Sequence, residues 1–322
     1  MIIRSLISLL LNTLLTVVMF HSTGIVYADD TRPKITGYIK SSFTNIPGND
    51  YDTSEFKVRN ARIKFAGNIS SSTEYCIFSD AVSDDVLLDA YITQKVTSSL
   101  SVKVGQFKTP YSTENLRGGS KLAFINRPYL QKDASPSFRD KGLQVSYKVN
   151  MFDLQVALMN GSGQNKAETN NNKSIAYRVV AYVIPQFQLS GNFYTGKNYP
   201  DDSLRDEFIN IGASGTTGTW EYSSEYAMKK HGTLTGSSFF AYVAYDWDTT
   251  LKRFPLLTSG LRAEFSDPNT NIGNNARSRY TIGLTAHFGK KYLNRVMINY
   301  ERCDDETGEP DDVIGIEYMV KY

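Results

Sequence analysis

Basic and aromatic residues are mixed in the segment from Lys108 to Arg139, which shows no regular alternation of apolar and polar positions. The basic residues are Lys108, Arg117, Lys121, Arg127, Lys132 and Arg139, and the aromatic residues are Tyr111, Phe124, Tyr129 and Phe138. The forked donors of arginine suit oxyanions, and lysine acts as a compact point charge. In a narrow passage such side chains replace the hydration of an anion. These residue types therefore indicate a site for small anions.

The same segment is framed by two strand-like runs, Leu100–Phe107 before it and Asp140–Val149 after it. An uncovered loop of this length is usually functional or disordered, and its aromatic and branched residues argue against disorder. Three prolines, at 110, 128 and 136, restrict its path. We therefore expect the loop to fold against other parts of the chain, at the mouth of a β-barrel.

Further basic residues lie on the polar faces of alternating segments elsewhere in the chain. Together with the loop residues they give the candidates for an anion-binding pore: Arg62, Lys64, Lys95, Lys103, Lys108, Arg117, Lys121 and Arg127. Acidic residues occupy polar faces too, at Asp89, Glu221, Glu225, Glu264, Glu301 and Glu317. For each basic residue, an ion pair with an acid on a neighbouring strand is therefore the alternative to a role in binding solute.

Segments of about ten alternating residues recur along the whole chain, and we predict about sixteen strands in one antiparallel barrel. The connections between them alternate between two kinds. Long polar loops are predicted near residues 44, 84, 120, 168, 201, 232, 271 and 307, and short turns near residues 70, 98, 150, 185, 217, 251 and 290. This segregation is typical of a transmembrane barrel, with the long loops outside the cell. The connection at Ser83–Asp85 is short although it falls on the long side. The loop from Lys108 to Phe138 is the third loop on the long-loop side.

The N-terminal residues predict export. Arg4, the apolar run Leu6–Phe20 and the small residue Ala28 form the pattern of a signal peptide over residues 1–28. Residues 29–322 then form a single barrel domain in the outer membrane of a Gram-negative bacterium, in contact with its lipid. The net charge of +2 gives no support for binding nucleic acid.

Catalytic and metal-binding patterns are weak. The three histidines, His21, His231 and His287, have no metal-ligand spacing, so neither a metal nor another cofactor is expected. Cys76 and Cys303 are predicted to remain free thiols, because candidate strands lie between them. Acidic clusters at Asp84–Asp85, Asp201–Asp202, Asp304–Glu306 and Asp311–Asp312 are interpreted as solvated loop charge rather than as sites for divalent cations.

Two alternatives of other classes remain open at this point. An outer-membrane barrel enzyme would need a serine, a histidine and an acid together, and His231 is the one histidine in a candidate outer loop. No serine stands out as its partner. A soluble exported β-sandwich that binds carbohydrate would also alternate apolar and polar residues.

Several runs in fixed order resemble the phosphate-selective porin O and P family. They are EFKVRNARIKFAGNI, LLDAYITQKV, LSVKVGQFKTPYSTENL, RDKGLQVSY and LMNGSG, and the resemblance is strongest from Phe56 to Gly163. It implies a sixteen-stranded outer-membrane porin, usually trimeric, whose third outer loop narrows a pore for anions such as phosphate. The chain has no long run of arginines, so passage of small anions or other small hydrophilic solutes remains an alternative to phosphate.

Overall fold

The described residues of the protein form sixteen strands, each hydrogen-bonded to its neighbours in sequence order. A computed structural model describes residues 32–46, 53–197, 204–306 and 311–322, so the predicted signal peptide lies outside the described residues. The strands are β1 (Lys34–Ile46), β2 (Thr53–Asn68), β3 (Thr73–Asp80), β4 (Leu87–Lys95), β5 (Leu100–Lys108), β6 (Arg139–Val149), β7 (Phe152–Met159), β8 (Ser174–Ile184), β9 (Phe187–Gly196), β10 (Asp206–Thr217), β11 (Trp220–His231), β12 (Leu234–Asp248), β13 (Leu256–Asp267), β14 (Arg277–His287), β15 (Asn294–Asp305) and β16 (Asp311–Lys321).

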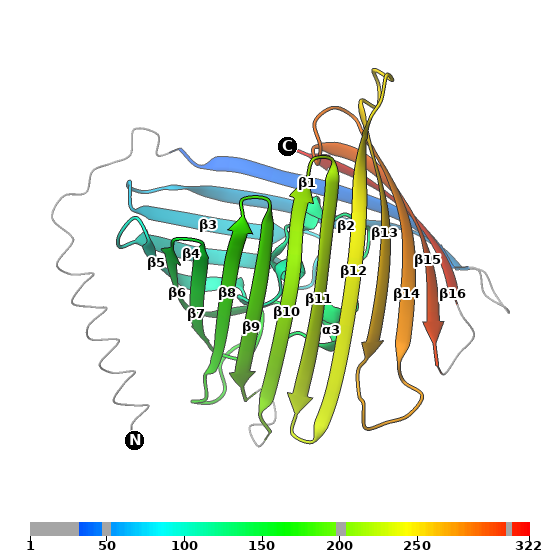
Figure 1. Cartoon of the computed structure of the whole chain (residues 1–322). Coiled ribbons are helices and arrows are strands. Elements are labelled where there is room, and N and C mark those ends of the chain that lie inside the picture. Colours follow the sequence, from blue (N-terminus) through cyan, green and yellow to red (C-terminus); the bar gives the residue numbers. More distant parts are fainter. Residues whose placement is uncertain (1–31, 47–52, 198–203, 307–310) are drawn as a thin grey trace.

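The sheet closes on itself because β1 pairs with β2 on one side and with β16 on the other, both antiparallel. At the seam, the backbone N–H of Gly37 donates to the carbonyl oxygen of Tyr322 at 2.9 Å, and the N–H of Tyr322 donates back at 3.0 Å. A closed ring leaves no unpaired sheet edge, which lipid could not satisfy. The predicted antiparallel barrel of about sixteen strands is confirmed (Figure 1).

The two faces of each strand differ in polarity. On β14, Ile282 and Leu284 point outward with 58% and 47% of their surface exposed, whereas Arg279 and Thr281 point inward with 6% and 1% exposed. Successive side chains of a strand lie on opposite faces, so one face meets lipid and the other lines the lumen. The luminal face of β14 is therefore its polar face.

The connections follow the predicted alternation with two differences. Asn150, with φ of 51°, makes the expected tight turn between β6 and β7. The long outer loop predicted near residue 232 is wrong, because β11 and β12 are joined by residues 232–233 alone. Gly232 has φ of 60°, which suits a two-residue hairpin turn. On the opposite side, the turn formed by residues 249–255 is longer than expected.

The segment between β5 and β6, residues 109–138, is enclosed by the ring, and we call it the inner loop (Figure 1). It contains α2 (Thr113–Leu116), the 3-10 helix η1 (Gly119–Lys121) and α3 (Leu130–Asp133). None of the helices in the described residues is long and apolar enough to span a bilayer.

The ring of Phe124 packs against two glycines of the luminal wall. Gly260 on β13 and Gly283 on β14 are register partners. A Cβ atom on either would lie 3.0–3.1 Å from that ring, which is closer than ordinary contact. The absence of side chains at these two positions therefore lets the inner loop pack directly against the wall.

We predict that Gly283→Val loosens the inner loop, because its side chain would overlap Phe124 and overpacking of this kind costs roughly 1–3 kcal/mol. Backbone amides of residues 119–127 should exchange with deuterium faster than in the unmodified protein. The matched control is Gly191→Val, since a Cβ at Gly191 meets no atom within 4 Å. Equal exchange in both variants would contradict the packing described here.

Candidate functional site

A row of luminal side chains on β8 to β11 ends at the inner loop. Arg178 Nη1 donates to Asn192 Oδ1 at 2.6 Å, and Asn192 Nδ2 donates to Asn210 Oδ1 at 2.6 Å. Asn210 Nδ2 in turn donates to one carboxylate oxygen of Glu225 at 2.9 Å. The other oxygen accepts the backbone N–H of Glu114, in α2, at 2.6 Å. Buried polar groups need such partners, so the row fixes the first half of the loop.

Arginines and glutamates on β13 to β15 hold the second half of the loop. Glu264 Oε1 lies 2.9 Å from Arg262 Nε and 2.7 Å from Arg279 Nε. Asn126 of the inner loop accepts a bond from Arg262 at its carbonyl oxygen, at 2.7 Å, and its side chain donates to Glu301 at 3.0 Å. The charged groups of Arg262 and Glu264 are almost completely buried. These charges are therefore engaged in holding the loop.

Lys108, the last residue of β5, is bound to the inner loop through all three of its ammonium donors. Its Nζ donates to the carbonyl oxygens of Asn115, Leu116 and Arg117 at 2.9, 3.2 and 3.0 Å. The same Nζ lies 4.7 Å from the centre of the Phe138 ring. Because an ammonium group has three donors, Lys108 has none left for a solute in this arrangement.

Two arginines of the inner loop have different electrostatic surroundings. Arg117 pairs with Glu114 at 2.8 Å and with Glu221 at 2.6 Å. Burial by itself lowers the pKa of Arg117, but the neighbouring carboxylates raise it above its usual range. Arg127 donates to the backbone carbonyls of Glu114 and Arg117 and has no carboxylate partner among the described residues. Burial lowers the pKa of Arg127 to about 10.

The inner loop meets the opposite wall at Gly119. A Cβ atom there would lie 2.5 Å from the Tyr38 hydroxyl and 3.1 Å from Arg62 Nη1, so a larger residue would collide with this wall. Arg62 is fixed in place by Asp80, at 2.8 Å, and by a 2.6 Å bond to the Tyr38 hydroxyl. The loop thus spans the lumen from β11 to β1 and β2.

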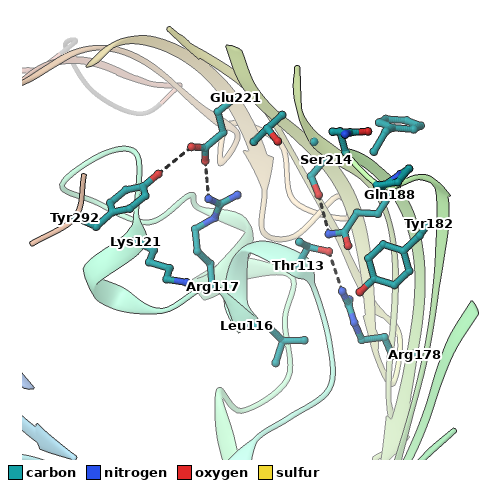
Figure 2. Close-up of a pocket in the computed structure, with 15 residues that line it drawn as sticks. Thr113, Leu116, Arg117, Lys121, Arg178, Tyr182, Gln188, Ser214, Glu221 and Tyr292 are labelled. Atoms are coloured by element: carbon teal, nitrogen blue, oxygen red, sulfur yellow. Dashed lines mark hydrogen bonds and ion pairs between the residues drawn. The ribbon is translucent and has the colours of Figure 1, made fainter. Parts of the chain in front are cut away.

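A cavity of about 530 Å³, which we call the turn-side cavity, lies between the inner loop and the short turns of β8 to β11. Figure 2 shows this cavity, with Arg117 and Lys121 extending from the inner loop and Arg178 from the barrel wall. Arg178 donates to Thr113 at 2.9 Å. Tyr292 donates to Glu221, which also accepts from Arg117. The side chain of Lys121 has no ion pair or hydrogen bond within the described residues.

A second cavity of about 440 Å³, which we call the outer cavity, lies between the inner loop and β1, β2, β4 and β6. One part of its lining is basic and another part is apolar. The basic residues are Lys40, Arg59, Arg62, Arg127 and Arg139, and the apolar residues are Leu88, Leu122, Ile125 and Phe138. The Asp85 carboxyl is the one acidic side chain among its described lining residues.

Lysines from β1, β2, β16 and the inner loop form a group near the short-turn end of the barrel. We call Lys34, Lys64, Lys121 and Lys321 the lysine cluster. The ammonium groups of the other three act electrostatically on that of Lys321. None of the four has an ion pair within the part of the chain that the structure describes. Like charges held together in this way attract anions.

The remaining two predicted residues lie apart from one another. Lys95 pairs with Glu74 at 2.5 Å, and both side chains are about half exposed. Lys103 has no ion pair in the described residues, and its ammonium lies 4.9 Å from the ring centre of Tyr91 and 5.2 Å from that of Phe107. The eight predicted residues therefore line several parts of the lumen rather than one site.

Sequence reasoning did not include Arg59, Lys40, Lys34 and Lys321. Arg59 was missed because the register shifts between Lys40 and Ser41, where β2 carries an extra residue. A bulge of this kind breaks the strict alternation from which luminal positions are read. Lys34 and Lys321 lie at strand ends, and their position beside Lys64 and Lys121 depends on closure of the ring.

The remaining candidates from the sequence are the two cysteines, His231 and the acidic clusters. Cys76 and Cys303 are free thiols, as predicted. His231 Nδ1 contacts the Asp206 carboxylate at the loop end of β10 and β11. Asp304 and Asp312 both pair with Arg302. The described residues contain no group of histidine, cysteine and acidic side chains suited to a metal ion, and Asp201–Asp202 lie outside them.

The fold matches those of solved outer-membrane proteins. OmpF of Salmonella typhi, in complex with daunomycin, superposes with a TM-score of 0.70 at 13% identity, covering 92% of this chain and 99% of that chain. An anion-selective porin from Comamonas acidovorans gives 0.70 at 10% identity, covering 91% and 100%. OmpT of Vibrio cholerae in its trimer form gives 0.65 at 11% identity, covering 90% and 99%. A search of curated protein sequences finds no significant match.

A closed sixteen-stranded barrel within the described residues, with a polar lumen crossed by an inner loop, defines the protein as an outer-membrane porin. The family model of phosphate-selective porin O and P matches residues 34–194, and the chain belongs to this family. The protein is therefore a channel for small solutes in the outer membrane of a Gram-negative bacterium.

We predict different effects for two lysine substitutions. Lys108→Met leaves three carbonyl oxygens of the loop without their donor, so amides of residues 111–118 should exchange faster with deuterium. Lys121→Met removes an unpaired luminal charge and should shift the reversal potential in a salt gradient while leaving that exchange unchanged. A larger shift of the reversal potential for Lys108→Met than for Lys121→Met would show that Lys108 acts on solutes directly.

Proposed function

We propose that this porin prefers anions and that unpaired basic residues of the lumen provide the preference. The observation that carries the proposal is an imbalance of free charge. Glu221, Glu264 and Glu317 each contact at least one lysine or arginine. Glu225 is bound instead by Asn210 and by the backbone N–H of Glu114. The lysine cluster and Arg127 have no acidic partner within the described residues. Charge that is already paired acts weakly on a solute, so the remaining field is positive.

The positions of the unpaired residues support a route past the inner loop. Arg127 lines the outer cavity, and Lys121 lines the turn-side cavity on another side of the same loop. Lys64 on β2 and Lys103 on β5 lie farther along the wall, with β3 and β4 between them. An anion that leaves one basic group would meet another, which allows entry without tight retention. Phosphate and other small anions both fit this description.

We predict that the double substitution Lys64→Glu and Lys321→Glu strongly reduces or reverses the anion preference, because it replaces two of four positive charges in the lysine cluster by negative ones. The measurement is the reversal potential of purified protein in planar bilayers under a potassium chloride gradient. Lys252→Glu is the control, since this exposed residue lies in the turn between β12 and β13. Cation preference of the unmodified protein would refute the proposal.

We also propose that the protein assembles as a homotrimer. The family resemblance supports this, as does the similarity in fold to an outer-membrane protein of Vibrio cholerae solved in a trimer form. Chemical cross-linking of the protein in mild detergent should give a ladder that ends at three chains and that disappears after heating. A ladder that ends at one or two chains would contradict the trimer.

A further inference from the structure

Three basic side chains surround the ring of Phe138 at the end of the inner loop. Lys108 Nζ lies 4.7 Å from the ring centre, and the guanidinium carbons of Arg127 and Arg139 lie 5.2 and 4.9 Å from it. Of the three, Arg139 alone has a carboxylate partner within the described residues, which is Asp89 at 2.8 Å. A buried charge without a counter-ion is unfavourable. An anion in the adjoining outer cavity would supply the missing negative charge to Arg127, which lines that cavity.

The opposite side of the outer cavity offers a further basic group that is only loosely held. Arg59 Nη2 donates to Asn126 at 3.1 Å, and its Nη1 lies 3.7 Å from Glu317, which is paired more closely with Lys40 at 2.7 Å. The side chain of Arg59 is 30% exposed, so it has access to the cavity. Arg59 and Arg127 therefore face the same space from the wall and from the loop.

Four apolar side chains form one part of the lining, beside polar residues such as Asn60 and Gln131. Leu88, Leu122 and Ile125 are buried with 4–6% of their surface exposed, and all three contribute to the cavity together with Phe138. A compact inorganic anion gains nothing from apolar surface. A carboxylate attached to a hydrocarbon body gains by removing that body from water.

We propose that the outer cavity binds organic carboxylates that carry an apolar body, and that it prefers them to inorganic anions. The carboxylate would lie between Arg59 and Arg127, and the body would contact Leu88 and Leu122. Planar forked donors suit a planar carboxylate. This inference rests on the proposed anion preference and specifies its substrate class.

The test measures how added anions reduce chloride current through the purified full-length porin in planar bilayers. Benzoate and cyclohexanecarboxylate are compared with acetate and inorganic phosphate at equal concentrations. Half-block by the first two should need a concentration lower by about tenfold, because the apolar body is buried in the cavity. Equal block by benzoate and acetate, or stronger block by phosphate than by benzoate, would overturn the proposal.

A pair of matched variants separates the two cavities. Leu122→Asn replaces an apolar side chain of the outer cavity by a polar one and should abolish the difference between benzoate and acetate. Leu116→Asn makes the same change in the same loop but lines the turn-side cavity, and it should preserve the difference. Leu88→Gln on β4 is the second variant for the outer cavity, used if Leu122→Asn does not give a folded barrel by circular dichroism. Retention of the difference in folded outer-cavity variants would overturn the proposal.

Failure of this inference is distinguishable from failure of the proposed function. The reversal potential in a potassium chloride gradient is recorded in the same membranes before the organic anions are added. Cation preference there would overturn the proposed function and this inference together. Anion preference with no advantage for benzoate would overturn this inference alone.

Discussion

The hydrocarbon interior of a membrane offers no partner for a backbone N–H or C=O group, and this constraint governs the whole structure. The strands satisfy it by pairing around a complete ring, in which β1 meets β16 and the ends of the sheet join. A closed ring separates an outer face from an enclosed one. Apolar residues such as Ile282 then face lipid, and charged residues such as Arg279 are confined to the lumen.

Charged residues confined to a narrow lumen need partners, and the inner loop provides many of them. Carboxylate oxygens of Glu225 and Glu264 accept backbone N–H groups of the loop, while Arg262 and Arg279 donate to loop carbonyls. Each contact satisfies a buried group on both sides. The loop is consequently held across the lumen by the wall itself, and the space that remains for a solute is divided between cavities beside it.

Paired and unpaired basic residues have different positions in this lumen. The arginines of β13 and β14 lie in buried networks with Glu264 and Glu301, where their several fixed donors satisfy more than one acceptor. The members of the lysine cluster have no acidic partner among the described residues. Fixed charge thus positions the loop, and unpaired charge is left to act on what passes it. This division explains why counting basic residues overstates the charge that a solute meets.

The sequence by itself determined the barrel, because strand length, alternation and the order of turns and loops all act locally. It also identified the inner loop, whose composition interrupts the alternation between Lys108 and Arg139. Only the tertiary structure decided what each charge does. Lys108 and Arg127 look alike in the sequence, yet the ammonium of Lys108 is fully engaged with loop carbonyls while Arg127 lines a cavity. The partner of each charged residue depends on which strands become neighbours when the ring closes and on how far the loop reaches across the lumen. Neither of these can be read from a short stretch of residues.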